Sequence, residues 1–61
     1  MKTYEQISKI LVAMSDETFQ QIADAVTDYQ FNDDMVAKAG AEKALAKHGL
    51  TLEEYLEWEA A

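Results

Sequence analysis

Hydrophobic and polar positions repeat with the period of an α-helix in four stretches of the chain, most clearly over residues 15–30. A turn of about 100° per residue separates two sides of this stretch. The apolar side carries Phe19, Ile22, Ala23, Ala25, Val26 and Tyr29. The polar side carries Asp16, Glu17, Gln20, Gln21, Asp24, Thr27 and Asp28. This pattern predicts an amphipathic helix whose outer side holds carboxylates and no lysine.

Residues that favour helix starts precede this helix and the one before it. Thr3 stands before an apolar face made of Tyr4, Ile7, Ile10, Leu11 and Met14. Gln6, three residues after Thr3, completes the pattern of a capping box. Ser15 is suited to cap the central helix. Val12 falls outside the apolar face of the first helix, and the sequence leaves open whether it contacts another helix or stays exposed.

A third helix is predicted over residues 34–48, with Asn32 or Asp33 as its N-cap. Small residues dominate its apolar side, which carries Ala37, Ala41, Ala44, Leu45 and His48, with Gly40 at the edge. Small side chains let a neighbouring helix approach closely but add little burial. Three of the five lysines also fall in this stretch.

Gly49 is a strong signal for the end of the third helix, and a fourth helix begins directly after it. Thr51 and Glu54 have the spacing of a capping box, and Leu50 is placed to pack against Tyr55. One side of the fourth helix carries Leu52, Tyr55, Leu56 and Trp58, and the other carries Glu53, Glu54 and Glu57.

The fold class predicted from these stretches is all-α, a compact bundle of three to four short helices forming one domain over residues 1–61. The chain has no Pro and only two Gly, and no stretch alternates as a strand does. There is no Cys, so the sequence excludes disulfides and thiolate metal sites. No apolar run reaches the roughly 20 residues that cross a bilayer, and the apolar residues 10–14 are too few for a secretory signal. We therefore expect a cytoplasmic protein.

The side chains that could support catalysis are few. His48 is the only imidazole, and its place beside Gly49 favours a structural role. Neither Ser8 nor Ser15 belongs to a set with a general-base partner and a glycine-rich turn, which nucleophilic catalysis would need. Adjacent carboxylates occur at predicted helix starts, where capping accounts for them. The sequence carries no calcium loop, zinc ligand set or phosphate-binding loop. We expect no enzyme activity, no cofactor and no metal.

The charge balance favours a basic partner. The chain has 12 acidic and five basic side chains and a formal charge of −7. Such a field opposes direct binding to nucleic acid or to an anionic membrane. The stretch FQQIADAV, residues 19–26, resembles the first helix of helix-turn-helix motifs, but the helix after it lacks side chains that read base edges. Solubility is the alternative explanation of the charge.

The first functional hypothesis is an inhibitor that docks on the basic, nucleic-acid-binding surface of another protein. Its carboxylates would imitate phosphates and bind Lys or Arg of the partner; they are Glu17, Asp24 and Asp28 on the central helix and Glu53, Glu54 and Glu57 on the last. Small, acidic, cysteine-free helical chains without a catalytic set are similar in general character to phage-encoded anti-restriction and anti-CRISPR proteins. The similarity is one of size and charge.

The second hypothesis is a helical adaptor or homodimeric structural module that uses apolar contacts. Tyr55, Leu56 and Trp58 would then be presented to a helix-binding groove, or the Ala-rich side of the third helix would pair with a second copy. The position of Tyr55 and Trp58 in a helix that completes a very small core favours packing, and contact with a partner can coexist with it. Salt distinguishes the two hypotheses, because an inhibitor bound by charge weakens as salt rises and an apolar module does not.

Overall fold

The computed structural model describes all residues, 1–61, and contains four α-helices and no strand. The helices are α1 (Tyr4–Ala13), α2 (Asp16–Asn32), α3 (Met35–Ala46) and α4 (Leu52–Ala60). The predicted all-α bundle is therefore confirmed. None of the four is both long enough and apolar enough to cross a membrane.

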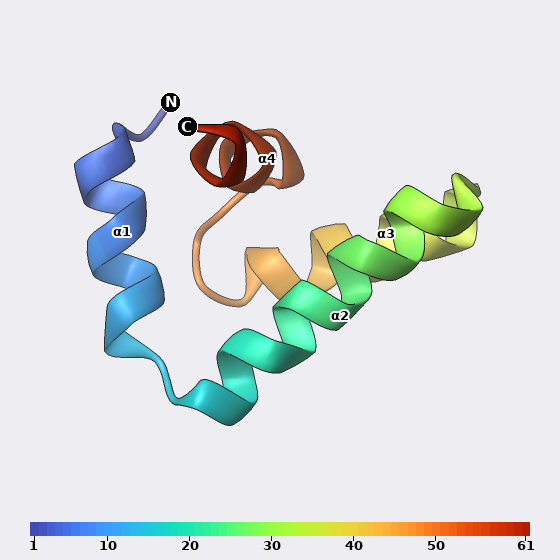
Figure 1. Ribbon diagram of the computed structural model, residues 1–61, viewed down its shortest axis with the longest axis horizontal. Helices are drawn as coiled ribbons and strands as arrows, with labels where there is room; N and C mark the ends of the chain where they lie inside the picture. The colour runs from blue at the N-terminus through green and yellow to red at the C-terminus, as the bar shows by residue number, and fades with distance from the viewer.

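The helices are arranged roughly as a ring. α4 lies between α1 and the hairpin formed by α2 and α3 (Figure 1). α2 and α3 run side by side as an antiparallel pair, and α4 packs against both α1 and α3. The two chain ends lie close together, because Lys2 and Ala61 line the same shallow hollow.

A single core joins residues of all four helices and of the segment before α4. Its buried members are Ile7, Leu11, Ile22, Val26, Ala41, Leu45, Leu50, Leu52 and Tyr55. Ala41 and Leu45 are fully buried, which fits the expectation that small residues on the third helix allow close approach. Val12 is 84% exposed, so it contacts no third helix.

Both predicted capping boxes are present. The Gln6 amide donates to Thr3 Oγ1 at 3.2 Å, and the Thr3 amide donates to the Gln6 side chain at 2.9 Å. The same exchange joins Thr51 and Glu54 at 3.1 and 2.9 Å. Ser15 caps α2 by accepting from the Thr18 amide at 3.1 Å.

The junction between α2 and α3 differs from the prediction. α2 continues to Asn32 and ends where Asp33 adopts a left-handed conformation, with φ of 48°. Asp34 is then extended, and its carboxylate accepts from the Ala37 amide at 2.7 Å. The N-cap of α3 is therefore Asp34, and the expected Asn32 or Asp33 cap is wrong, because those two residues complete the preceding helix.

The end of α3 shows why glycine is needed at position 49. Gly49 has φ of 76°, which is the left-handed region. Its amide donates to the Ala46 carbonyl at 3.0 Å, and the Leu50 amide donates to the Leu45 carbonyl at 3.1 Å. These two bonds form a Schellman motif, which satisfies the last carbonyls of the helix. α3 proper ends at Ala46, two residues before the predicted end.

Candidate docking surfaces

The three carboxylates predicted on the central helix form an exposed acidic ridge on α2, made of Glu17, Asp24 and Asp28. Asp24 accepts from the Gln20 side chain at 2.8 Å, and Asp28 accepts from the Asn32 side chain at 2.6 Å. The only ion pairs in the structure are Lys2 with Glu54 and Lys9 with Glu5. No lysine therefore neutralises the acidic ridge.

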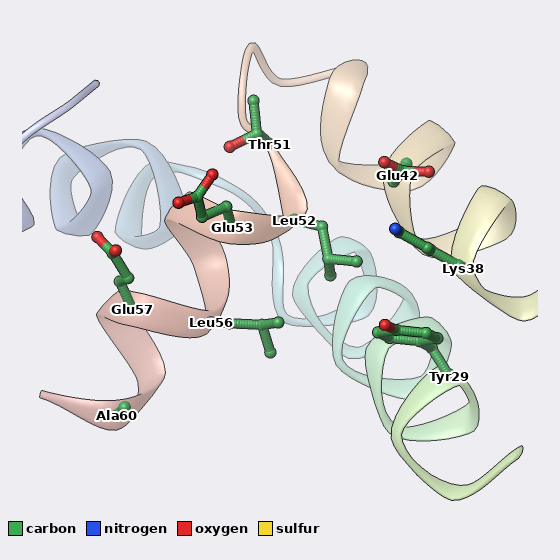
Figure 2. Close-up of a pocket in the computed structure, with 9 residues that line it drawn as sticks. All are labelled: Tyr29, Lys38, Glu42, Thr51, Leu52, Glu53, Leu56, Glu57 and Ala60. Carbon is green, nitrogen blue, oxygen red and sulfur yellow. The ribbon is translucent and has the colours of Figure 1, made fainter. Parts of the chain in front are cut away.

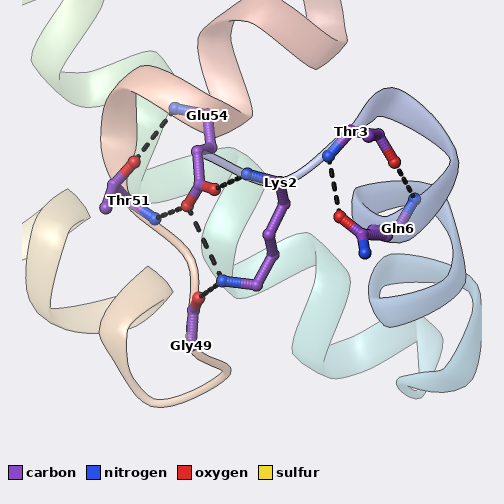
Figure 3. Close-up of polar contacts among 6 residues, drawn as sticks. All are labelled: Lys2, Thr3, Gln6, Gly49, Thr51 and Glu54. Atoms are coloured by element: carbon purple, nitrogen blue, oxygen red, sulfur yellow. Dashed lines mark hydrogen bonds and ion pairs between the residues drawn. The ribbon is translucent and has the colours of Figure 1, made fainter.

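The last helix divides its three predicted carboxylates between surface and interior. Glu53 and Glu57 are exposed, whereas Glu54 is only 3% exposed. The expectation that Glu54 shares an outer acidic side with its neighbours is wrong. The capping box turns its carboxylate back over the helix start, where the N-terminal segment covers it (Figure 3).

Glu54 joins the N-terminal segment to the start of α4. Its Oε2 accepts from the Lys2 amide at 2.7 Å, and its Oε1 accepts from the Thr51 amide. The Lys2 ammonium lies 4.0 Å from Oε1 and donates to the Gly49 carbonyl (Figure 3). These donors, first the Lys2 amide and then the Thr51 amide, lower the pKa of Glu54 from its ordinary value. The carboxylate of Glu54 therefore makes hydrogen bonds within the fold and is not accessible to a partner.

The two aromatic residues predicted as possible anchors are part of the fold. Tyr55 is 1% exposed, and burial, followed by the negative charge of Glu59, raises the pKa of its hydroxyl. Trp58 is half-buried and donates from its indole nitrogen to Ser8 Oγ at 2.8 Å. Its ring lies 6.2 Å from Tyr4 and 6.4 Å from Phe19, centroid to centroid. Core packing, the role that the sequence favours for this pair, is what the structure shows.

A groove of about 570 Å³ lies between α4 on one side and α2 and α3 on the other. Figure 2 shows Leu52, Leu56 and Tyr29 pointing toward one another across it. Its rim carries Glu53 and Glu57 from α4, and Lys38 and Glu42 from α3; Thr51 and Ala60 complete the lining. An apolar floor with a rim of three carboxylates and one ammonium is the most site-like concavity of the molecule.

The groove contains residues that the sequence pattern did not single out. Glu42, Lys38 and Tyr29 line it, yet periodicity places Tyr29 only on the apolar side of its own helix and assigns no role to Glu42. Their common location depends on how α3 packs relative to α4, which no single-helix periodicity reports. The acidic ridge contributes none of the lining residues, so the structure does not bring all the predicted carboxylates into one groove.

A second unpredicted feature is an exposed apolar tip at the α2–α3 junction. Phe31, Met35 and Val36 are 84%, 86% and 83% exposed. Phe31 faces outward because it follows Ile22 by nine helical residues, which places it about half a turn away around the helix. Phe31 therefore shares the outer side of α2 with the acidic ridge.

Comparison with known proteins gives no relative: no family model, no curated protein and no solved structure matches the chain. The structure also places no three His, Asp or Glu side chains where they could hold a metal ion. The acidic ridge, the groove and the apolar tip are the surface features through which the protein could contact another molecule.

Proposed function

We propose that this protein is a small inhibitor that docks its acidic surface on the basic, nucleic-acid-binding surface of another protein. The observation that carries the proposal is the acidic ridge of Glu17, Asp24 and Asp28, which is exposed along α2 and has no lysine paired with it. Glu53 and Glu57 add exposed negative charge on α4. A row of fixed carboxylates can replace phosphates against Lys and Arg side chains of a partner.

The net charge of −7 supports the same proposal through kinetics. Oppositely charged surfaces accelerate the encounter of two proteins, and the acceleration falls as ionic strength rises. Binding by the acidic ridge should therefore be fast and sensitive to salt. A partner that binds nucleic-acid phosphates should also dissociate from the inhibitor when nucleic acid competes for the same surface.

The experiment is capture of proteins on the immobilised chain, followed by elution with duplex DNA or RNA. Proteins released by nucleic acid at constant ionic strength support the proposal. The Asp24→Lys/Asp28→Lys variant should lose this capture, whereas Glu5→Lys/Glu59→Lys, which changes the net charge equally on other helices, should keep it. Captured proteins that withstand an excess of both nucleic acids would rule the inhibitor out.

A second candidate function is a homodimeric or adaptor module, and the apolar tip of Phe31, Met35 and Val36 favours it. Exposed large apolar side chains in one place are typical of protein contacts. The discriminating measurement is the mass in solution by light scattering at low and high salt. A dimer that persists in salt, and that the substitution Phe31→Ser disrupts, would rank this module above the inhibitor.

A further inference from the structure

We propose that the groove between α4 and the α2–α3 hairpin receives a basic amphipathic helix of the partner. This inference deepens the proposed function and rests on it only for the partner's positive charge. It identifies the part of the partner that is recognised, and it assigns a role to Glu42 and Leu56, which the acidic ridge does not involve.

The floor of the groove has the spacing of a helix-binding surface. Leu52, a core residue that is 7% exposed, and Leu56, which is half-buried, lie one turn apart on α4 and both line the groove, a separation of about 6 Å along the axis. Aliphatic side chains at positions i and i+4 of a docked helix repeat at the same interval. Tyr29 closes the floor from α2 (Figure 2). A helix with one aliphatic stripe therefore matches the floor.

The rim selects the charge of that helix. Glu53 and Glu57 repeat with the same one-turn interval along α4, and Glu42 stands on the α3 side. Neither Lys38 nor any other lysine forms an ion pair with these three carboxylates. Lys or Arg residues one turn apart, beside the aliphatic stripe, would meet Glu53 and Glu57, so an acidic or neutral helix is disfavoured.

The groove also has a suitable size and setting. About 570 Å³ is enough for several side chains but not for a folded domain. Leu56 and Tyr29 are half-buried in the free protein, so a docked helix would cover apolar surface that water now reaches. That burial would supply binding free energy that is insensitive to salt, in addition to the salt-sensitive rim contacts.

The test uses a synthetic helical peptide of roughly 14 residues, about four turns, with leucines at i and i+4 spacing and lysines along one flank. A control peptide has the same composition in an order that destroys the stripe. Titration is followed through the backbone amide NMR signals. We expect the striped peptide to shift the signals of Tyr29, Leu52 and Leu56 and to bind more tightly than the control.

Two protein variants make the test specific. Glu53→Gln/Glu57→Gln keeps the shape of the rim and should weaken the striped peptide roughly tenfold, which is about 1.4 kcal/mol. Glu5→Gln/Glu59→Gln removes the same charge elsewhere and should change the affinity less than twofold or so. Equal binding of both peptides, or signal shifts confined to Phe31, Met35 and Val36, would overturn the groove proposal.

The two proposals fail separately. If nucleic acid elutes the captured partners but the striped peptide does not shift the NMR signals of the groove residues, the inhibitor proposal is supported through the acidic ridge alone. The groove inference is then wrong. If the striped peptide binds in the groove but nucleic acid elutes nothing, the groove inference stands and the inhibitor is wrong.

Discussion

The backbone amide of Lys2 and the carboxylate of Glu54 meet at 2.7 Å although 52 positions of the chain separate them. The same carboxylate caps α4 through the Thr51 amide. One side chain therefore caps the start of α4 and also binds the N-terminal segment beside that helix. Glu54 is one of two side chains, with Trp58, whose hydrogen bonds join α4 to the N-terminal part of the chain.

The substitution Glu54→Ala should destabilise the protein strongly. It removes the bonds to Lys2 and Thr51 together and leaves their amides without a protein acceptor. We expect the midpoint of thermal unfolding to fall by roughly 5–10 °C. The matched control is Glu53→Gln, the exposed neighbour in the same turn, which should move the midpoint by no more than about 2 °C. Equal losses for both variants would contradict the role of Glu54.

The lowered pKa of Glu54 predicts a specific dependence of stability on pH. A carboxyl group with a lowered folded pKa stabilises the folded state above its unfolded value, here 4.5, and this contribution disappears as pH falls through the folded pKa. Protonation of the other carboxylates changes stability in the same range, so the useful quantity is the difference between the parent and Glu54→Gln. That difference should be constant above about pH 5 and shrink in acid, as followed by circular dichroism. A difference that grows in acid would be the opposite of this prediction.

The elements that the sequence predicted well are those determined by neighbours in the chain. The capping boxes at Thr3 and Thr51 depend on residues three positions away, and both are present. Gly49 stops the helical path after α3 as predicted, because its backbone requires a conformation that glycine adopts readily. The apolar face of α2 follows from helical periodicity, and Ile22 and Val26 are buried as expected.

The features that the sequence could not give depend on contacts between helices. A glutamate at the third position of a helix caps it whether it is exposed or buried, so the burial of Glu54 cannot be predicted without knowing that Lys2 lies beside it. The groove likewise needs α3 beside α4 before Glu42 can be associated with Glu53. Phe31 is a different case, because continuing the periodicity of α2 by one more residue would have placed it on the outer side.

The two glycines should respond to alanine in opposite directions. Gly49 has φ of 76°, and an L-residue in the left-handed region costs roughly 1–2 kcal/mol. Gly40 lies within α3, is exposed, and would place a Cβ in open space, so alanine there should add roughly 0.4–1 kcal/mol. Urea unfolding of Gly49→Ala and Gly40→Ala measures both. A loss of stability in the Gly40 variant would contradict this prediction, because it would show that the added Cβ is not accommodated at this position.

The hydrogen bond from Trp58 to Ser8 should couple α4 to α1. The substitution Ser8→Ala leaves the half-buried indole nitrogen of Trp58 without its acceptor at 2.8 Å, which should lower the free energy of unfolding by about 1 kcal/mol. The same substitution in a Trp58→Phe background should cost much less, because the phenyl ring has no donor. A double-mutant cycle from urea unfolding gives the coupling energy, and a value near zero would show that the bond adds nothing to stability.

The acidic ridge predicts a trade-off between stability and binding. Asp24 and Asp28 lie one turn apart on α2, where like charges destabilise a helix by roughly 0.2–0.5 kcal/mol. Substituting Asp28→Lys replaces this repulsion with attraction to Asp24, so we expect the free energy of unfolding to rise by about 0.5 kcal/mol. Asp28→Asn, which only removes the repulsion, should give a smaller gain. If the ridge serves a basic partner, the more stable lysine variant will be the one that loses capture, because a surface kept for binding is not optimised for stability. Urea unfolding and capture measured on the same preparations test this, and a lysine variant that gains stability and still captures the partner would show that Asp28 has no part in binding.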